Sequence, residues 1–149
     1  MKTLAEVKAT TIGEYFGTLL ESVTQAHIDH LRTGKYAKHI ALNEYYDEAP
    51  DLIDDIIEHY QGINGIVEGM KNNIELSDEP ETIEYLTLLK EFTKEGAKQF
   101  FKEDDSELFS DVDTFVSLID STLYKLKELK ESKEKQIKSL SKYLKESLN

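Results

Sequence analysis

Apolar residues recur at intervals of three and four over most of the chain, a spacing that places them along one face of an α-helix. The first amphipathic segment covers residues 11–32 and ends at Thr33-Gly34, because a glycine is typical of a helix C-terminus. We expect its apolar face, with His27 on it, to pack in a core. That face consists of Ile12, Phe16, Leu19, Leu20, Val23, His27 and Leu31.

The second segment predicts a helix from Tyr36 to Tyr60, with a kink at Pro50 and a C-terminal stop at Gly62. Residues 63–76 follow, with two further glycines and weak periodicity, and there we expect a short crossover helix of about two or three turns. The predicted apolar face of the second helix is Ile40, Tyr46, Ile53, Ile56, Ile57 and Tyr60.

The third predicted helix has Ser77 or Asp78 as its N-cap and Pro80 in its first turn, and it continues to about Lys102. The fourth begins near Ser106 and continues toward the end of the chain. The apolar positions are Ile83, Leu86, Leu89 and Phe92 in the third helix, and Val112, Phe115, Val116, Ile119, Leu123, Leu126 and Leu129 in the fourth.

Beyond residue 130 the apolar positions form a narrow stripe, which indicates a coiled-coil seam or a helix that packs on a neighbouring subunit. The stripe is Ile137, Leu140, Leu144 and Leu148. Together, these segments predict an all-α fold: a ferritin-like four-helix bundle with a crossover between the second and third helices and an extended C-terminal helix. The bundle covers residues 1–130, and a Lys-rich helical extension covers residues 131–149.

Charge and composition narrow the chemistry. The chain has no cysteine, so a metal must be held by nitrogen and oxygen ligands. The net charge is −12, but residues 121–149 contain 8 Lys and 4 Glu, which leaves −16 on residues 1–120. A basic tail can bind DNA, yet the alternation of Lys with Glu favours a solvated helix face or a subunit contact. Long apolar runs and a basic leader are absent, so we expect a protein that is neither secreted nor bound to a membrane.

Two histidines face each other across the first predicted hairpin. His27 and His39 each lie six residues from residue 33, at about 9 Å along their own helices. A lone histidine on an apolar face is more often a hydrogen-bonded core residue than a ligand, so the argument rests on the combination. We interpret His30 and His59 as surface residues or as supports for the ligands.

Two carboxylates on the second helix form another half-site. Asp54 and Glu58 are four residues apart and therefore share a helix face. His39 and Asp54 are 15 residues apart, about 22 Å along a helix, so one metal ion cannot contact both within one chain. Antiparallel packing of two copies of this helix about a two-fold axis brings His39 of one copy opposite Asp54 of the other. The spacing predicts a homodimer with two mixed sites.

The spacing of His27, His39, Asp54 and Glu58 resembles the ferroxidase signature of the Dps-type miniferritins. In that family the histidines come from one subunit and the carboxylates from its two-fold mate. The resemblance implies an iron-binding protein that oxidises Fe(II) with peroxide or dioxygen. In that family the iron site is sometimes dinuclear. Two positions depart from the family pattern: Asn43 stands where an aspartate is common, and Ile28 where a tryptophan is common.

These departures change the expected site. An amide is a weaker metal ligand than a carboxylate, so Asn43 favours one secure iron position and a weaker second one. Without a tryptophan at position 28, a tyrosine has to trap oxidising intermediates, and we name Tyr45, Tyr46 and Tyr60 as the candidates. No glycine-rich phosphate loop, nucleophile elbow or HExxH motif is present, so the sequence gives no support to hydrolases or nucleotide enzymes.

The chain is also similar to small uncharacterised proteins of tailed phages, over residues 26–47, 52–62 and 121–130. This resemblance implies a phage origin, and hence a place in the host cytoplasm or with the virion. Two functions remain open. One is Fe(II) binding and oxidation at sites between subunits. The other is a phage structural or interaction protein that has a ferritin-like scaffold and no metal activity.

Overall fold

The computed structural model describes Leu4, residues 8–71, Leu76 and residues 81–148. The regular structure in this part of the chain is all helical, which confirms the all-α class. The elements are α1 (Ile12–Arg32), α2 (Tyr36–Asn64), α3 (Thr82–Phe100), α4 (Ser106–Tyr124), the π-helical turn η2 (Lys125–Leu129) and α5 (Lys130–Ser147).

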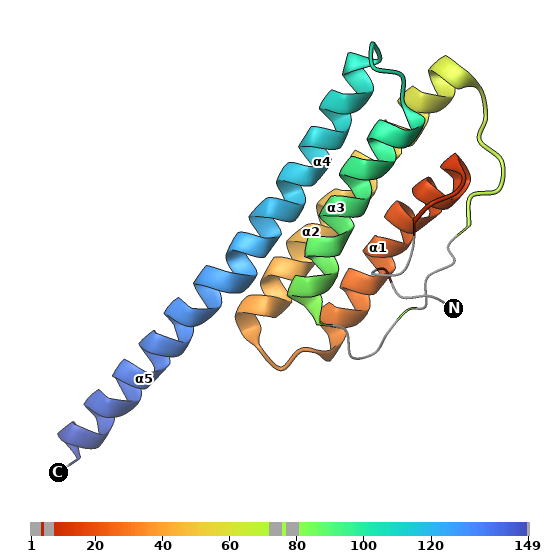
Figure 1. Ribbon diagram of the computed structural model, residues 1–149. Helices are drawn as coiled ribbons and strands as arrows, with labels where there is room; N and C mark the ends of the chain where they lie inside the picture. Colours follow the sequence, from red (N-terminus) through yellow and green to blue (C-terminus); the bar gives the residue numbers. More distant parts are fainter. Residues whose placement is uncertain (1–3, 5–7, 72–75, 77–80, 149) are drawn as a thin grey trace.

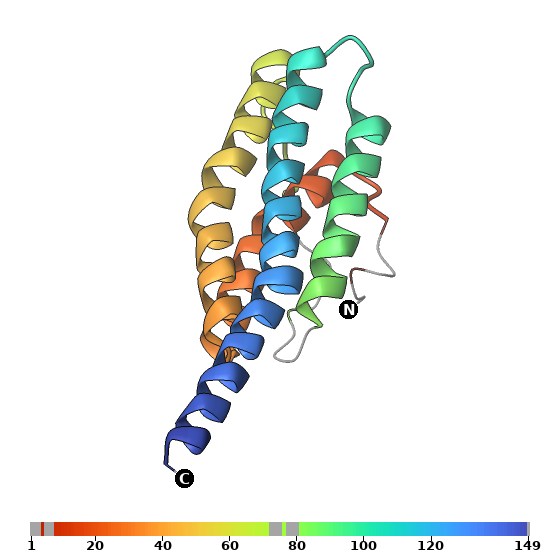
Figure 2. The same ribbon diagram turned by 90° about the vertical axis from the view of Figure 1, so that its left-hand side faces the viewer.

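Helices α1 to α4 lie side by side (Figure 1). α1 packs against α2 and α3, and α4 packs against the same two helices. α1 and α4 run in one direction, and α2 and α3 run in the other (Figures 1 and 2). Each packed pair is therefore antiparallel. Because α2 ends at the opposite end of the molecule from the start of α3, the chain between them has to cross the length of the helices.

The start of α1 is fixed by its own side chains. Thr11 is the N-cap, and its hydroxyl accepts a hydrogen bond of 3.1 Å from the backbone N–H of Glu14. The Glu14 carboxylate reaches back and accepts bonds from the backbone N–H and the hydroxyl of Thr10, at 3.0 and 2.8 Å. These bonds satisfy donors that a helix N-terminus otherwise leaves open, and the predicted start of this helix is confirmed.

The end of α2 differs from the prediction. The helix continues through Pro50 and through Gly62, and it ends at Asn64. Gly65 is the C-cap, with a φ of 89° that favours glycine, whereas Gly62 has ordinary helical geometry. Residues 65–71 are not helical, so the predicted crossover helix is absent from the described part of residues 63–76.

The boundaries of α3 shift slightly. The helix begins at Thr82 with Glu81 as its N-cap and ends at Phe100, two residues before the predicted end. The predicted capping residues Ser77 and Asp78, and Pro80, lie outside the described residues. The predicted start of α4 at Ser106 is confirmed.

Part of the predicted core face of α1 is wrong. Phe16 and Leu19 are buried, but Leu20, His27 and Leu31 are exposed. Polar residues take their places in the interior: Ser22, Gln25, Asp29 and His30. The predicted core face of this helix did not include these four polar residues. On α2, similarly, Tyr45 is fully buried and Ile40 is exposed.

Glycine permits close approach at two places. A Cβ atom on Gly13 or Gly17 would lie 2.4 or 2.2 Å from the backbone oxygens of Gly69 or Lys71, so the chain that follows α2 lies directly on α1. A Cβ on Gly96 of α3 would lie 2.2 Å from the ring of Tyr15. This contact allows the buried Tyr15 hydroxyl to donate a 2.6 Å hydrogen bond to the carbonyl of Thr93.

α4, η2 and α5 follow one another without a break, and α5 projects beyond the other helices (Figures 1 and 2). Near the base of this projection, the Lys125 ammonium donates to the Glu44 carboxylate of α2. Large apolar side chains remain exposed along α5: Ile137, Leu140, Tyr143, Leu144 and Leu148.

Candidate functional site

His30 of α1 and His39 of α2 form a reciprocal pair. The Nδ1 of His30 lies 2.8 Å from the carbonyl oxygen of His39, and the Nδ1 of His39 lies 3.1 Å from the carbonyl oxygen of His30. Their rings stack with centroids 3.6 Å apart. We call these two residues the histidine pair. It joins the last turn of α1 to the first turn of α2.

The hydrogen bonds of the histidine pair determine which nitrogen of each ring carries a proton. A carbonyl oxygen only accepts, so each Nδ1 must donate and therefore carries a proton. In the neutral ring the remaining nitrogen, Nε2, then has a free lone pair. Metal-binding histidines commonly donate their other ring N–H to a backbone carbonyl, which orients the ring. Within the described part of the chain, the Nε2 of His39 has no hydrogen-bond partner.

Tyr46 connects the histidine pair to His27. Its ring stacks on that of His27, with centroids 4.4 Å apart, and meets the ring of His30 edge to face at 5.0 Å. The Tyr46 hydroxyl lies 3.3 Å from Nε2 of His30 and donates a 2.8 Å hydrogen bond to the side-chain oxygen of Asn43. The Asn43 amide nitrogen in turn donates to Asp47 at 2.9 Å.

The three tyrosines predicted to replace the missing tryptophan differ in their surroundings. Tyr45 is fully buried and bonds Ser22, and Tyr60 packs against Phe16 and Phe101 in the core. Tyr46 alone of the three contacts a predicted ligand.

The predicted ligands His27, Asp54 and Glu58 are exposed, and His39 is half-buried. Asp54 and Glu58 lie on the middle and later turns of α2, far from His39 at its start. Among the residues that the structure describes, no group of three or more His, Asp or Glu side chains within one chain is placed to hold a metal ion. The four residues can share one ion only if a second chain supplies some of them.

The other two histidines differ from each other. His30 is buried, so its interpretation as a surface residue is wrong, but it supports His39 directly. His59 is exposed and bonds Asp111 of α4 at 2.5 Å. The carboxylate of Asp111 raises the pKa of His59 because it stabilises the imidazolium form.

A buried carboxylate, which the apolar pattern did not predict, ties α1 to α3. Asp29 accepts a 2.9 Å bond from the amide of Gln25 and a 3.1 Å bond from the hydroxyl of Thr82. Burial raises its pKa, and these two bonds and the charge of Lys38 act in the opposite direction. The spacing of Ser22, Gln25 and Asp29 was the available signal, because three- and four-residue steps place them on the same side of the helix as Leu19.

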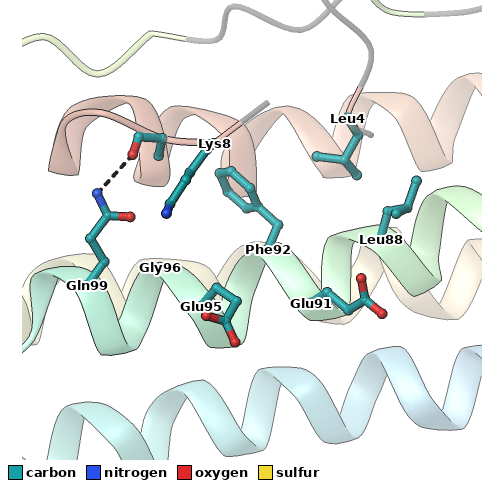
Figure 3. A pocket seen from close by; sticks show the side chains of 9 residues that line it. Leu4, Lys8, Leu88, Glu91, Phe92, Glu95, Gly96 and Gln99 are labelled. Carbon is teal, nitrogen blue, oxygen red and sulfur yellow. Dashed lines mark hydrogen bonds between the residues drawn. The ribbon is translucent and has the colours of Figure 1, made fainter. Parts of the chain in front are cut away.

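A cavity lies elsewhere, between the N-terminal segment and α3 (Figure 3). Its volume is about 270 Å³, and its walls include Leu4, Phe92 and Leu88. The amide of Gln99 donates a 3.0 Å bond to the carbonyl of Ala9 at one end. Its lining also includes Lys8 and the carboxylates of Glu91 and Glu95. Among the described residues, these carboxylates are not part of a group of three or more His, Asp or Glu side chains placed to hold a metal ion.

Comparison with known proteins places this all-helical chain among phage-related proteins. It belongs to the DUF5856 family, a family of unknown function, whose model matches residues 30–126. It is also similar to an uncharacterized 14.6 kDa protein in the mobD-ri intergenic region of Enterobacteria phage T4, with 38% identity over 58 residues.

The T4 match covers 39% of this chain and 45% of the T4 protein, so the chain spans less than half the length of that relative. No solved structure matches the chain. The family match begins at His30, so it contains both residues of the histidine pair. Within the described residues, no helix is long and apolar enough to span a membrane.

Proposed function

We propose that this protein binds Fe(II) between two subunits, with His27 and His39 from one chain and Asp54 and Glu58 from the other. The observation that carries the proposal is the orientation of His39. Its Nδ1 is held by the carbonyl of His30, so Nε2 is the nitrogen available to a metal. Fe(II) is the substrate in this proposal, and its oxidation by peroxide or dioxygen is the reaction implied by the resemblance to miniferritins.

Exposure supports a shared site. A residue that binds a metal together with a second chain must lie at the surface of its own chain. His27, Asp54 and Glu58 are exposed and His39 is half-buried, so each is accessible to a partner. His27 is not buried in a core, so the strongest objection to its role as a ligand does not apply.

The helix arrangement supports a ferritin-like bundle. In ferritin-like proteins one long connection joins the second helix to the third, and the metal ligands project from facing helices. Here α2 and α3 run in the same direction and each packs antiparallel to α1 or α4. We therefore assign the ferritin-like arrangement to this chain as part of the proposal.

Asn43 favours a single iron position at each site. Its oxygen accepts from Tyr46 and its nitrogen donates to Asp47, so both ends of the amide are used within the chain. A metal at this position would share the amide oxygen with the Tyr46 hydroxyl, and that oxygen carries no negative charge. We assign one Fe(II) to each site, rather than a dinuclear centre.

Charge makes the proposed dimer dependent on the metal. Six acidic residues are exposed on α2, and two antiparallel copies bring these carboxylates together: Asp47, Glu48, Asp51, Asp54, Asp55 and Glu58. Like charges at close range oppose association. A divalent cation that binds only across the dimer offsets this repulsion and shifts the equilibrium by mass action. We expect α2-mediated association to require the cation.

Anaerobic Fe(II) titration tests the proposal. Wild type should show saturable binding, and His39→Ala should lose it. His59→Ala is the matched control because His59 lies on the same helix, is exposed and is not a proposed ligand. Absence of saturable binding in wild type, or equal binding by His39→Ala, contradicts the proposal.

Mixing two variants tests whether the site is shared. His39→Ala and Asp54→Ala should each bind no Fe(II) alone, because each homodimer has two broken sites. A mixed dimer contains one site with both residues intact, so an equimolar mixture should recover about a quarter of the wild-type capacity. A mixture that recovers nothing contradicts the shared site, and a variant that binds fully alone contradicts the ligand assignment.

A second candidate function is a phage interaction or structural protein that binds no metal. The specific observation that favours it is α5, which projects from the bundle with its large apolar side chains exposed. Exposed apolar surface of this kind marks contact sites between proteins. This function predicts an assembly that chelators do not change.

A further inference from the structure

The apolar stripe of α5 consists of Ile137, Leu140, Leu144 and Leu148, whose side chains are 66%, 59%, 52% and 86% exposed. At about 100° per residue, all four lie within an arc of about 80° on the helix. Intervals of three and four over so narrow an arc are typical of a seam between two helices. The stripe is therefore shaped for one partner helix, and not for a broad surface.

Within residues 137–148, the lysines lie away from this stripe. Lys138, Lys142 and Lys145 are about 95° or more from its centre, and Ser141 and Ser147 lie nearer to it. A second α5 can thus pack on the stripe while the lysines of both helices stay in water. An anionic membrane is a poorer occupant, because lipid contact through the stripe would turn Lys142 away from the head groups and bring an acidic body to the surface.

We infer that two copies of this chain pair through α5 in antiparallel orientation. The stripe is self-complementary in that orientation: Leu140 faces Leu144 of the second copy, Ile137 faces Leu148, and the two-fold axis passes near Lys142. Each layer has an apolar residue on both sides.

Net charge selects the antiparallel orientation. Residues 1–120 carry −16 in each chain. A parallel pair sets these two bodies side by side. In the antiparallel pair, residue 126 of one chain lies about 48 Å along the rod from residue 126 of the other. This separation exceeds the screening length of about 8 Å at physiological ionic strength, so the bodies no longer repel.

This pairing is independent of the proposed Fe(II) site, since it uses neither the histidine pair nor the acidic face of α2. It predicts a dimer in the presence of a chelator. Sedimentation equilibrium of the full chain in chelator should give the dimer mass for wild type and the monomer mass for Leu140→Lys/Leu144→Lys. The control Ser139→Lys/Glu146→Gln adds the same charge to the opposite face and should remain a dimer.

Orientation is measured by a pair of spin labels. Because the chain has no cysteine, Ser121→Cys introduces a unique label site at an exposed position of α4. The antiparallel pair predicts a distance of about 60 Å between the two labels, and a parallel pair predicts less than about 30 Å. Circular dichroism of each variant establishes that the helices are retained.

Four results of these measurements on the protein alone overturn the inference: a wild-type monomer in chelator, a dimer that survives Leu140→Lys/Leu144→Lys, a control variant that becomes monomeric, or a short label distance. Vesicles of anionic phospholipid provide the remaining comparison. Wild type should stay in solution as a dimer. Sedimentation with the vesicles through Leu140 and Leu144 would assign the stripe to lipid and overturn pairing.

Discussion

His30 and His39 each donate from Nδ1 to the backbone carbonyl of the other, at 2.8 and 3.1 Å, although they belong to different helices. This exchange makes each ring the support of the other. Because both Nδ1 atoms are used in this exchange, Nε2 is the remaining nitrogen of His39. The pair thus joins α1 to α2, and it leaves Nε2 of His39 as the nitrogen that the proposed Fe(II) site would use.

The close contact between Gly96 and Tyr15 gives a stability prediction. Gly96→Ala places a methyl group against a fully buried ring that a hydrogen bond to Thr93 holds in place. We expect the free energy of unfolding to fall by about 1–3 kcal/mol, as overpacked cores do. Chemical denaturation monitored by circular dichroism measures it.

Gly62→Ala is the matched control. Gly62 lies within α2 with open space around its Cβ position and without a positive φ. Alanine there should raise the free energy of unfolding by about 0.5–1 kcal/mol, because it restricts the unfolded chain. Equal effects of the two substitutions would show that Tyr15 does not limit the space at Gly96.

The bond between His59 and Asp111 predicts a pH dependence. The pKa of His59 is raised above 6.5 by Asp111, so this bond stabilises the fold below pH 6.5 and is lost as the pH rises through the folded-state pKa. An NMR titration of wild type should place the His59 pKa above 6.5. Asp111→Asn should lower it toward that value, and an unchanged pKa would refute the cause.

Asp29 predicts a second pH dependence of stability, which arises from burial and not from a charged partner. Its pKa is raised above 3.8 by burial, so the protonated form suits the fold, and stability from this group declines as the pH rises through the folded-state pKa. Asp29→Asn keeps the shape without the charge. Its unfolding midpoint, measured from pH 4 upward in steps of about one unit, should decline less than that of wild type. The exposed Asp51→Asn serves as the control, and a parallel decline in Asp29→Asn counts against the buried charge.

Asn43→Asp tests why one iron position is expected per site. The substitution removes the amide that donates to Asp47 and adds a carboxylate close to Tyr46. The Fe(II) stoichiometry should rise from one to two per site, since a carboxylate is the stronger ligand. A stoichiometry that stays at one would indicate that another residue limits the second position.

The four long helices α1 to α4 were predictable from apolar spacing, since each buries a face with three- and four-residue intervals, but the short crossover helix predicted from weak periodicity is absent from the described residues. The face of α1 that is buried was not predicted correctly. His27 was expected in the core, whereas Asp29 and His30 are buried there. Their burial depends on partners from other helices, Thr82 and His39, which a one-dimensional pattern does not contain.

Helix boundaries were predicted correctly where one clear local sequence signal marked them. α1 begins where its sequence predicted, but Gly62 was mistaken for the end of α2 because two glycines three residues apart give the same signal. Only the backbone angle of Gly65 distinguishes them. The ligand set stays a prediction, because it depends on how two chains meet.

The unbroken succession of α4, η2 and α5 has a mechanical consequence. From Ser106 to Ser147 the backbone is helical throughout, a rod of about 63 Å with one end anchored beside α2 and α3. A load applied at the tip near Leu148 is carried as torque to the anchored end. The π-helical turn at Lys125–Leu129, where the backbone ladder is locally wider, is the place at which such a lever would bend first.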